Sequence, residues 1–182
     1  MDWLTDGVRR IKFPALVVAL SIALLPTAGQ ASSRTPGKVI AGYVEKLTIK
    51  PWDVTVSAKL DTGALTSSIH AEDVERFKKD DEKWVRFTLV LKDSKDKLHR
   101  IPAERPLERR VKIKEDDDNH DRRLVVALDF CFDGRERSAQ FTLNDRSNYL
   151  YPVLLGRRFL EDVAIVDPAA SFLTQRNCPP IE

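Results

Sequence analysis

The sequence has little of what most nucleotide-dependent and metal-dependent enzymes need. It contains only seven glycines and three histidines in 182 residues, and no G-x-x-x-x-G-K-[ST] segment that could cradle a phosphate. The histidines, His70, His99 and His120, do not have the H-E-x-x-H spacing of a zinc peptidase. No G-x-S-x-G turn is present for a serine nucleophile. We therefore expect no cofactor and no metal, and a metallopeptidase is the least favoured class of enzyme.

The chain also has little excess of charge of either sign. The chain has 30 Lys and Arg against 28 Asp and Glu, which leaves a formal net charge of +2 and no basic tail. A protein that binds nucleic acid through its phosphates usually carries a marked basic excess, so we expect no nucleic-acid partner. No internal repeat is visible, and the length suggests a single domain.

The sequence has no long hydrophobic run, but it has a short one near the N-terminus. Residues 15–25 form this run of 11 residues, well below the roughly 20 needed to span a bilayer. Arg9, Arg10 and Lys12 precede it, and small residues end at Ala31. This pattern predicts a signal peptide over residues 1–31, a linker over 32–37, and a periplasmic or secreted protein. The alternative is an uncleaved signal anchor.

Cysteine is limited to two residues, Cys131 in a strand-like run and Cys178 near the C-terminus. Neither has a C-x-x-C partner, which argues against a zinc knuckle or a thioredoxin-like site. In an oxidising compartment the two could form a disulfide that holds the tail. The other possibility is a buried thiol and a separate thiol in the tail.

Short alternating apolar segments dominate the rest of the chain. Strands are expected at 39–49, 54–60, 84–91, 98–101, 124–132, 138–143, 151–155 and 163–166, with a short helix starting at 157. Residues 71–79 are compatible with a short helix. Many short strands with frequent turns indicate a mostly antiparallel, barrel-like β domain over residues 38–176, followed by a tail over 177–182.

The most informative segment is Asp61-Thr62-Gly63-Ala64, which follows an alternating strand and precedes Thr66. A strand that delivers an aspartate into a tight Thr-Gly turn suits an aspartic peptidase, in which two carboxylates share one proton. Glycine lets the backbone turn sharply and approach a substrate closely. Taken alone, the tripeptide is equally typical of an ordinary turn.

A second segment, Leu154-Leu155-Gly156-Arg157, lies far downstream. The segment resembles the strand of two apolar residues and a glycine that, in retroviral-type aspartic peptidases, crosses behind the catalytic loop and supports it. Alone it would fit any buried strand that ends at a glycine. The combination with Asp61-Thr62-Gly63 favours the peptidase interpretation.

Both segments, from Lys59 to Ala71 and from Tyr151 to Leu160, resemble bacterial retropepsin-like aspartic peptidases, often named ATP-dependent zinc proteases. The resemblance extends over roughly residues 38–174. It implies a retropepsin-like acid-protease β-barrel with one lobe per chain and a short C-terminal helix. It also implies a catalytic carboxylate at Asp61, contributed by each chain of a homodimer, and a peptide or protein substrate.

The resemblance has further consequences. Some members of that family are associated with ATP-grasp peptide ligases or transglutaminase-like membrane proteins, which suggests such partners here. Members commonly carry a basic residue at the position of Leu65, so a substrate or salt-bridge contact made there is not expected in this chain. A non-catalytic peptide-binding module of the same fold is the alternative to an enzyme.

Other polar groups have weaker claims to a function. His70 lies near the Asp61 loop and could be structural, contact a substrate or bind a metal. The acidic segment 116–121 is expected to be a solvated loop, since it lacks the glycine and the distant glutamate of a calcium loop. A basic strip over residues 109–114 is expected to be a solvated strand face, with recognition of an acidic peptide as the alternative. The segments 93–97 and 104–123 are both candidates for a flap over the site.

Overall fold

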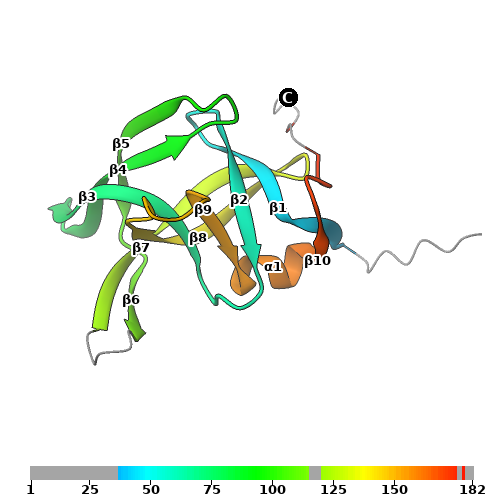
Figure 1. Cartoon of the computed structure of the whole chain (residues 1–182). Helices are drawn as coiled ribbons and strands as arrows, with labels where there is room; N and C mark the ends of the chain where they lie inside the picture. Colours follow the sequence, from blue (N-terminus) through cyan, green and yellow to red (C-terminus); the bar gives the residue numbers. More distant parts are fainter. Residues whose placement is uncertain (1–36, 115–119, 176–177, 179–182) are drawn as a thin grey trace, which may run out of the picture. The chain divides into compact units, whose positions relative to one another are not determined.

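The computed structural model describes residues 37–114, 120–175 and 178. The predicted signal peptide (1–31), almost all of the predicted linker (32–37) and most of the predicted tail (177–182) lie outside the described residues. So do residues 116–119 of the acidic segment. The described residues form ten strands and one short helix (Figure 1). The elements are β1 (Val39–Ile49), β2 (Val54–Asp61), β3 (Ser67–Lys79), β4 (Glu82–Lys92), β5 (Leu98–Pro106), β6 (Arg109–Lys114), β7 (His120–Phe132), β8 (Arg135–Asn144), β9 (Val153–Gly156), α1 (Arg157–Val163) and β10 (Ala164–Ser171).

The centre of the fold is a closed barrel. Strands β1, β2, β9, β3, β8 and β7 are hydrogen-bonded in that order, and β7 returns to β1 through the pairs Thr48–Cys131 and Ile49–Phe130. Outside this ring, β10 pairs in parallel with β1, β6 pairs with β7, and the β4–β5 hairpin extends from β3. In Figure 1 this hairpin lies at the top left and α1 at the lower right, beside β10. The prediction of a mostly β, retropepsin-like barrel with one short helix near the C-terminus is confirmed.

Alternation along each strand separates the core from the surface. In β2, the residues Val54, Val56, Ala58 and Leu60 are buried. The residues between them, Thr55, Ser57, Lys59 and Asp61, are partly or fully exposed, because successive side chains of a strand point to opposite faces. Lys59 and Asp61 therefore share the outward side of β2.

Aromatic side chains fill the centre of the barrel. Phe130 packs edge-on against Phe141 with ring centroids 5.7 Å apart, and Phe132 packs in the same way against Phe159 at 5.6 Å. Phe159 belongs to α1, which also buries Leu160 and Val163. The helix is thereby fixed to the barrel by its apolar side. No helix in the described part of the chain is long and apolar enough to cross a bilayer.

The short helix that the sequence allowed over residues 71–79, and that the family resemblance would make irregular, is not formed, since these residues belong to the long strand β3. Their composition favours a helix, but Phe77 pairs with Trp84 and the whole segment pairs with β4. The turn that joins the two strands is formed by Asp80 and Asp81, both with positive φ angles of 50° and 61°. Two central residues with positive φ are what a tight two-residue hairpin requires. Cross-strand pairing therefore outweighs the local helix propensity.

The C-terminal segment is held against the barrel by a buried carboxylate. Glu45 of β1 is fully buried. Its Oε1 accepts hydrogen bonds from the backbone N–H groups of Gly42 (2.6 Å) and Leu173 (2.8 Å). Its Oε2 accepts from the backbone N–H of Thr174 (3.2 Å) and from the Thr174 hydroxyl (2.8 Å). Four donors on one carboxylate compensate for its burial.

A disulfide lies beyond this contact. The sulfur atoms of Cys131 and Cys178 are bonded, with 5.7 Å between the two Cα atoms. Cys131 lies in β7, so the bond joins the C-terminal segment to the same strand that closes the barrel.

Candidate active site

Asp61 is the last residue of β2, and the loop after it holds its carboxylate. Oδ1 accepts hydrogen bonds from the backbone N–H groups of Gly63 (2.9 Å) and Ala64 (3.2 Å). These bonds wrap the turn around the carboxylate and fix its direction relative to the strand. Thr62 and Gly63 are exposed, so the loop is open to solvent on its outer side.

The strand β9 supports this loop from behind. It runs parallel to β2, with Leu60 opposite Leu155 and Asp61 opposite Gly156, and it pairs on its other side with β3 through Leu154 and Ser68. The predicted supporting segment is thus hydrogen-bonded between the two strands that enter and leave the Asp61 loop. Its last predicted member, Arg157, is the first residue of α1 rather than part of the strand.

Gly156 lies where the loop and β9 come closest. Its N–H donates to the Ser67 hydroxyl at 3.0 Å, and the N–H of Arg157 donates to the carbonyl of Ala64 at 2.8 Å. A Cβ atom at Gly156 would lie 2.7 Å from the carbonyl carbon of Thr66 and 3.0 Å from the carbonyl oxygen of Ala64. Only glycine fits there without a shift of the loop backbone.

A basic residue lies on the free side of the carboxylate. The Lys59 ammonium group is 3.2 Å from Asp61 Oδ2. Partial burial by itself raises the pKa of Asp61. The hydrogen bond from Lys59, the N–H groups of Gly63 and Ala64 and the charge of Lys59 act the other way, and the net result is a pKa below the usual range. An isolated Asp61 is therefore ionised at neutral pH.

Arg109 also anchors the loop, and the sequence did not indicate this role. It was expected to belong to a solvated basic strip, yet its guanidinium group donates to the Thr66 hydroxyl (3.2 Å) and to the side-chain carbonyl of Gln140 (2.8 Å). Burial, followed by the nearby charge of Arg158, lowers its pKa. The contact links the start of β6 to the end of the Asp61 loop. No local signal separates Arg109 from its basic neighbours, since its partners lie far away in sequence.

His70 has a structural contact rather than a place at the carboxylate. Its Nδ1 accepts a hydrogen bond from the backbone N–H of Arg146 at 2.8 Å. Asp145 and Glu72 lie 3.6 Å and 3.8 Å from its two ring nitrogens. This bond joins β3 to the loop that follows β8, and the ring is almost fully buried.

The side chain of Arg146 continues this arrangement. Its Nε donates to the carbonyl of Tyr151 at 3.2 Å, and its guanidinium group lies 4.5 Å from the centre of the Tyr149 ring. Burial lowers the pKa of Arg146. The interaction with Tyr149 opposes this change, the charge of Arg123 adds to it, and the charge of Asp61 opposes it. Lys59 is the cation whose charge lowers the pKa of Asp61, whereas the side chain of Arg146 is bonded to the Tyr151 carbonyl.

The remaining histidines lie elsewhere. His99 is bonded to Asp93 at 2.8 Å in the β4–β5 hairpin, and the side chain of His120 lies outside the described residues. Within the described ranges, no group of three or more His, Cys, Asp and Glu side chains could hold a metal ion.

Two grooves adjoin this region. One, of about 610 Å³, lies between β8 and α1, and Thr66, Gln140 and Arg158 are among its lining residues. The other, of about 400 Å³, lies beside β3, β6 and β7. Its charged lining residues are Arg76, Arg110, Arg122, Arg123 and Asp145.

Comparison with known proteins agrees with this geometry. Residues 40–177 match the family model of the RimB-like proteins, described as the retropepsin-like aspartic endopeptidase RimB. The chain therefore belongs to the RimB-like family of retropepsin-like proteins. A crystal structure of protein Lpg0085 from Legionella pneumophila is similar to this chain, with a TM-score of 0.63 and 35% identity. The match covers 75% of this chain and 98% of that one.

Curated relatives carry a different kind of name. A probable alpha-L-glutamate ligase of Shewanella halifaxensis is 34% identical over 128 residues, which cover 70% of this chain and 28% of that protein. A probable alpha-L-glutamate ligase of Desulfotalea psychrophila is 32% identical over 114 residues, which cover 63% of this chain and 24% of that protein. The chain spans only about a quarter of the length of these relatives.

Proposed function

We propose that this protein is an aspartic endopeptidase that works as a homodimer, with one Asp61 from each chain. The observation that carries the proposal is the Asp61 carboxylate itself. It stands at the end of a barrel strand, is held by two backbone N–H groups, and is supported from behind by β9. One Asp-Thr-Gly segment per chain supplies one carboxylate, so a pair requires two chains related by a two-fold axis.

The chemistry follows from sharing one proton between the two carboxyl groups. Like charges about 3 Å apart cannot both be ionised cheaply, so one Asp61 is ionised and the other is protonated. The ionised carboxylate takes a proton from a water molecule, which attacks the carbonyl carbon of the peptide bond. The protonated carboxyl group donates a hydrogen bond to the carbonyl oxygen. The peptide bond breaks when the carboxyl group that took the proton from water passes it to the leaving nitrogen, which returns the pair to one charge and one proton.

The test of the catalytic role is a digestion of a peptide library by the wild type and by Asp61→Asn. The amide is nearly the same size as the carboxyl group but cannot accept the proton of water, so cleavage should be abolished with the fold intact. Asp129→Asn is a matched control, because Asp129 is exposed on β7. Full cleavage by pure Asp61→Asn would refute the aspartic mechanism. Peptide binding without cleavage by the wild type would favour the binding module, and loss of activity with a chelator would favour a metallopeptidase.

The dimer is tested by mixing subunits. Asp61→Asn chains are combined with an equal amount of wild type at fixed total concentration and allowed to exchange. If both carboxyl groups are needed, only about one quarter of the dimers are intact, and the activity per chain falls to about a quarter rather than to about half. A fall to one half would mean that each chain works alone.

We also propose that the protein is exported. The short apolar run after three basic residues supports this, and so does the Cys131–Cys178 disulfide, since such bonds persist mainly outside the cytosol. Cleavage is expected after Ala31, which leaves a periplasmic or secreted domain. Mass spectrometry of the N-terminus of the cell-derived protein tests this. An intact Met1 on membrane-bound protein would favour the signal anchor.

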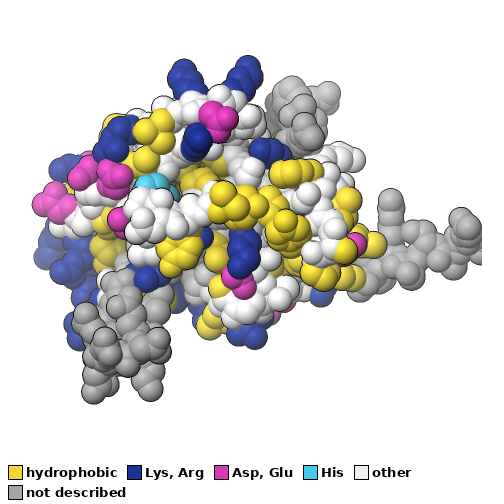
Figure 2. Space-filling view, in the orientation of Figure 1, with side chains coloured by type: hydrophobic (Ala, Val, Ile, Leu, Met, Phe, Trp, Pro, Cys, Tyr) yellow, Lys and Arg dark blue, Asp and Glu magenta, His cyan; other side chains and the backbone are white. Residues whose placement is uncertain are grey.

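The relatives' names suggest a class of substrate and a partner. We propose that the peptidase acts on glutamate-rich peptides and is associated with an ATP-grasp ligase. The groove lined by Arg76, Arg110 and Arg122 supports this, as does the gathering of basic side chains, with some carboxylates among them, at the left edge of Figure 2. Paired substrates that differ only by Glu→Gln replacement would test the preference. It should weaken as salt is raised, because exposed charges are screened. Equal rates on both substrates would contradict it.

A further inference from the structure

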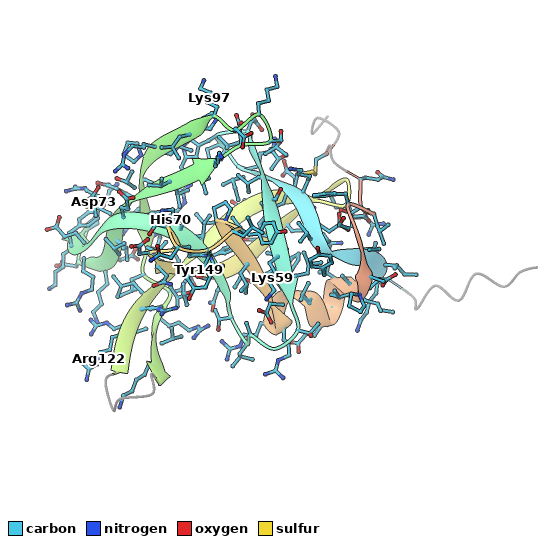
Figure 3. All side chains as sticks on the ribbon, viewed as in Figure 1. Lys59, His70, Asp73, Lys97, Arg122 and Tyr149 are labelled. Atoms are coloured by element: carbon cyan, nitrogen blue, oxygen red, sulfur yellow. A yellow bond between two sulfur atoms is a disulfide. The ribbon has the colours of Figure 1, made fainter. Side chains whose placement is uncertain are left out.

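Lys59 is placed to act on the proposed catalytic carboxylate. It lies two residues before Asp61 on the outward side of β2, and it projects from the lower part of that strand in Figure 3. Its ammonium group is 3.2 Å from Oδ2, whereas Oδ1 is taken by the loop N–H groups. Both carboxylate oxygens are thus held, one by backbone groups and the other by a side-chain cation.

Other charged groups near the carboxylate do not duplicate this contact. From the loop after β8, Arg146 has its pKa raised by the charge of Asp61, but the hydrogen bond of its guanidinium group goes to the carbonyl of Tyr151. On β6, Arg109 is bonded to Thr66, and on α1 the charge of Arg158 acts on Arg109. On β3, His70 is turned to the backbone of Arg146. Lys59 alone among these side chains is bonded to the carboxylate.

We propose that Lys59 is a positioning residue that orients the Asp61 carboxylate through Oδ2 and moves the working range of the Asp61 pair to lower pH. This inference rests on the proposed function. The pair works only while it holds one proton. A cation beside each carboxylate favours the ionised form. With Lys59 present, the pair therefore loses its first proton at lower pH, and it also loses its second proton at lower pH, than it would without Lys59.

The sign of the effect gives a specific expectation for Lys59→Met, which keeps the length of the side chain and removes its charge. Both limbs of the pH profile of kcat/KM should move to higher pH. The ratio of the variant's rate to the wild-type rate should therefore be below one on the acidic side and above one on the alkaline side. A purely structural loss would lower the rate at every pH and leave the limbs in place.

Two variants serve as controls. Lys59→Arg keeps the cation and should restore the wild-type limbs. Lys46→Met removes another lysine from the same surface, whose ammonium group is bonded to the Ser57 hydroxyl at 2.7 Å. It should leave the profile unchanged. The proposal is overturned if the limbs of Lys59→Met coincide with those of the wild type, or if Lys46→Met shifts them equally.

A second measurement does not depend on cleavage. The side-chain carboxyl carbons of aspartate are labelled with ¹³C, Asp61→Asn assigns the resonance, and the titration is followed by NMR in the wild type and in Lys59→Met. The Asp61 carboxyl should titrate at higher pH in the variant, and identical titrations would overturn the proposal. If Asp61→Asn cleaves peptides normally, the proposed function fails instead, whatever the titration shows.

Discussion

Replacing Glu45 with glutamine should destabilise the protein by about 3 kcal/mol, although the two side chains have nearly the same shape. The carboxylate is fully buried and accepts four hydrogen bonds, three from backbone N–H groups and one from a hydroxyl. Hydrogen bonds to a charged acceptor contribute about 1.5–3 kcal/mol each, against about 1 kcal/mol for neutral pairs. Glutamine removes the charge and turns one acceptor oxygen into a donor.

The loss can be divided between the two oxygens. If the amide nitrogen of glutamine replaces Oε2, the two hydrogen bonds to Oε1, from Gly42 and Leu173, weaken from the charged to the neutral range. The buried backbone N–H of Thr174 then loses its acceptor, which costs about 1–3 kcal/mol. The Thr174 hydroxyl can reverse its role and accept from the new amide. Relief from burying a charge offsets part of the loss, which leaves the estimate of roughly 3 kcal/mol.

Urea unfolding with the disulfide intact measures the change, and the melting temperature should fall by about 10 °C. Hydrogen exchange should show the N–H groups of Leu173 and Thr174 losing protection first. Glu75→Gln is the control, since Glu75 is exposed on β3 and its replacement should stay within about 0.5 kcal/mol of the wild type. A Glu45→Gln protein as stable as that control would refute the reasoning.

Three further predictions concern other parts of the barrel. Gly156→Ala should reduce peptidase activity sharply and destabilise by about 1–3 kcal/mol, because the new methyl group would lie 2.7 Å from a carbonyl carbon of the Asp61 loop; normal activity in a folded variant would count against the support role of β9. Replacing both Cys131 and Cys178 by serine removes a cross-link between residues 47 positions apart. The free energy of unfolding should fall by up to about 4 kcal/mol, and an unchanged midpoint of urea unfolding would contradict this prediction. The hydrogen bond from His99, and then backbone N–H groups, lower the pKa of Asp93 to about 2. Since the ordinary value is about 3.9, this stabilisation is present above about pH 4 and is lost as pH falls towards 2; a carboxyl titration by NMR with a midpoint near 4 would show that the bond is absent.

Much of the barrel could be predicted from period-two alternation, because a strand with one face in the core must place apolar residues at every second position. β2 follows that rule along its whole length, and β7 follows it from Val126 to Phe130. Residues 71–79 do not, since their outer half is charged on both sides and pairs with β4 outside the closed ring. There the strand is determined by its partner and by the Asp80-Asp81 turn, which local propensity does not reveal.

The candidate site also contains residues that the sequence could reveal and residues that it could not. Asp61 and Gly156 could be found because their motifs are local and carry a chemical reason. Arg109 could not, since it lies 43 residues from its Thr66 partner. The same holds outside the site for Glu45, which lies 129 residues from Thr174. A strip of basic residues looks solvated in sequence even when one of its members is turned inward. Such contacts become visible only when the sheet order is known.

The position of β9 between β2 and β3 has a consequence for the order of assembly. The Gly156–Ser67 hydrogen bond joins residues 89 positions apart, so the Asp61 loop cannot obtain its support until almost the whole domain has been synthesised. Contacts of such separation form late and slow the folding of β proteins. A nascent or truncated chain that ends before β9 would carry the Asp-Thr-Gly turn without the strand that holds it in place. If the proposed function holds, incomplete chains should therefore be inert as peptidases, because their Asp61 loop lacks the support of β9.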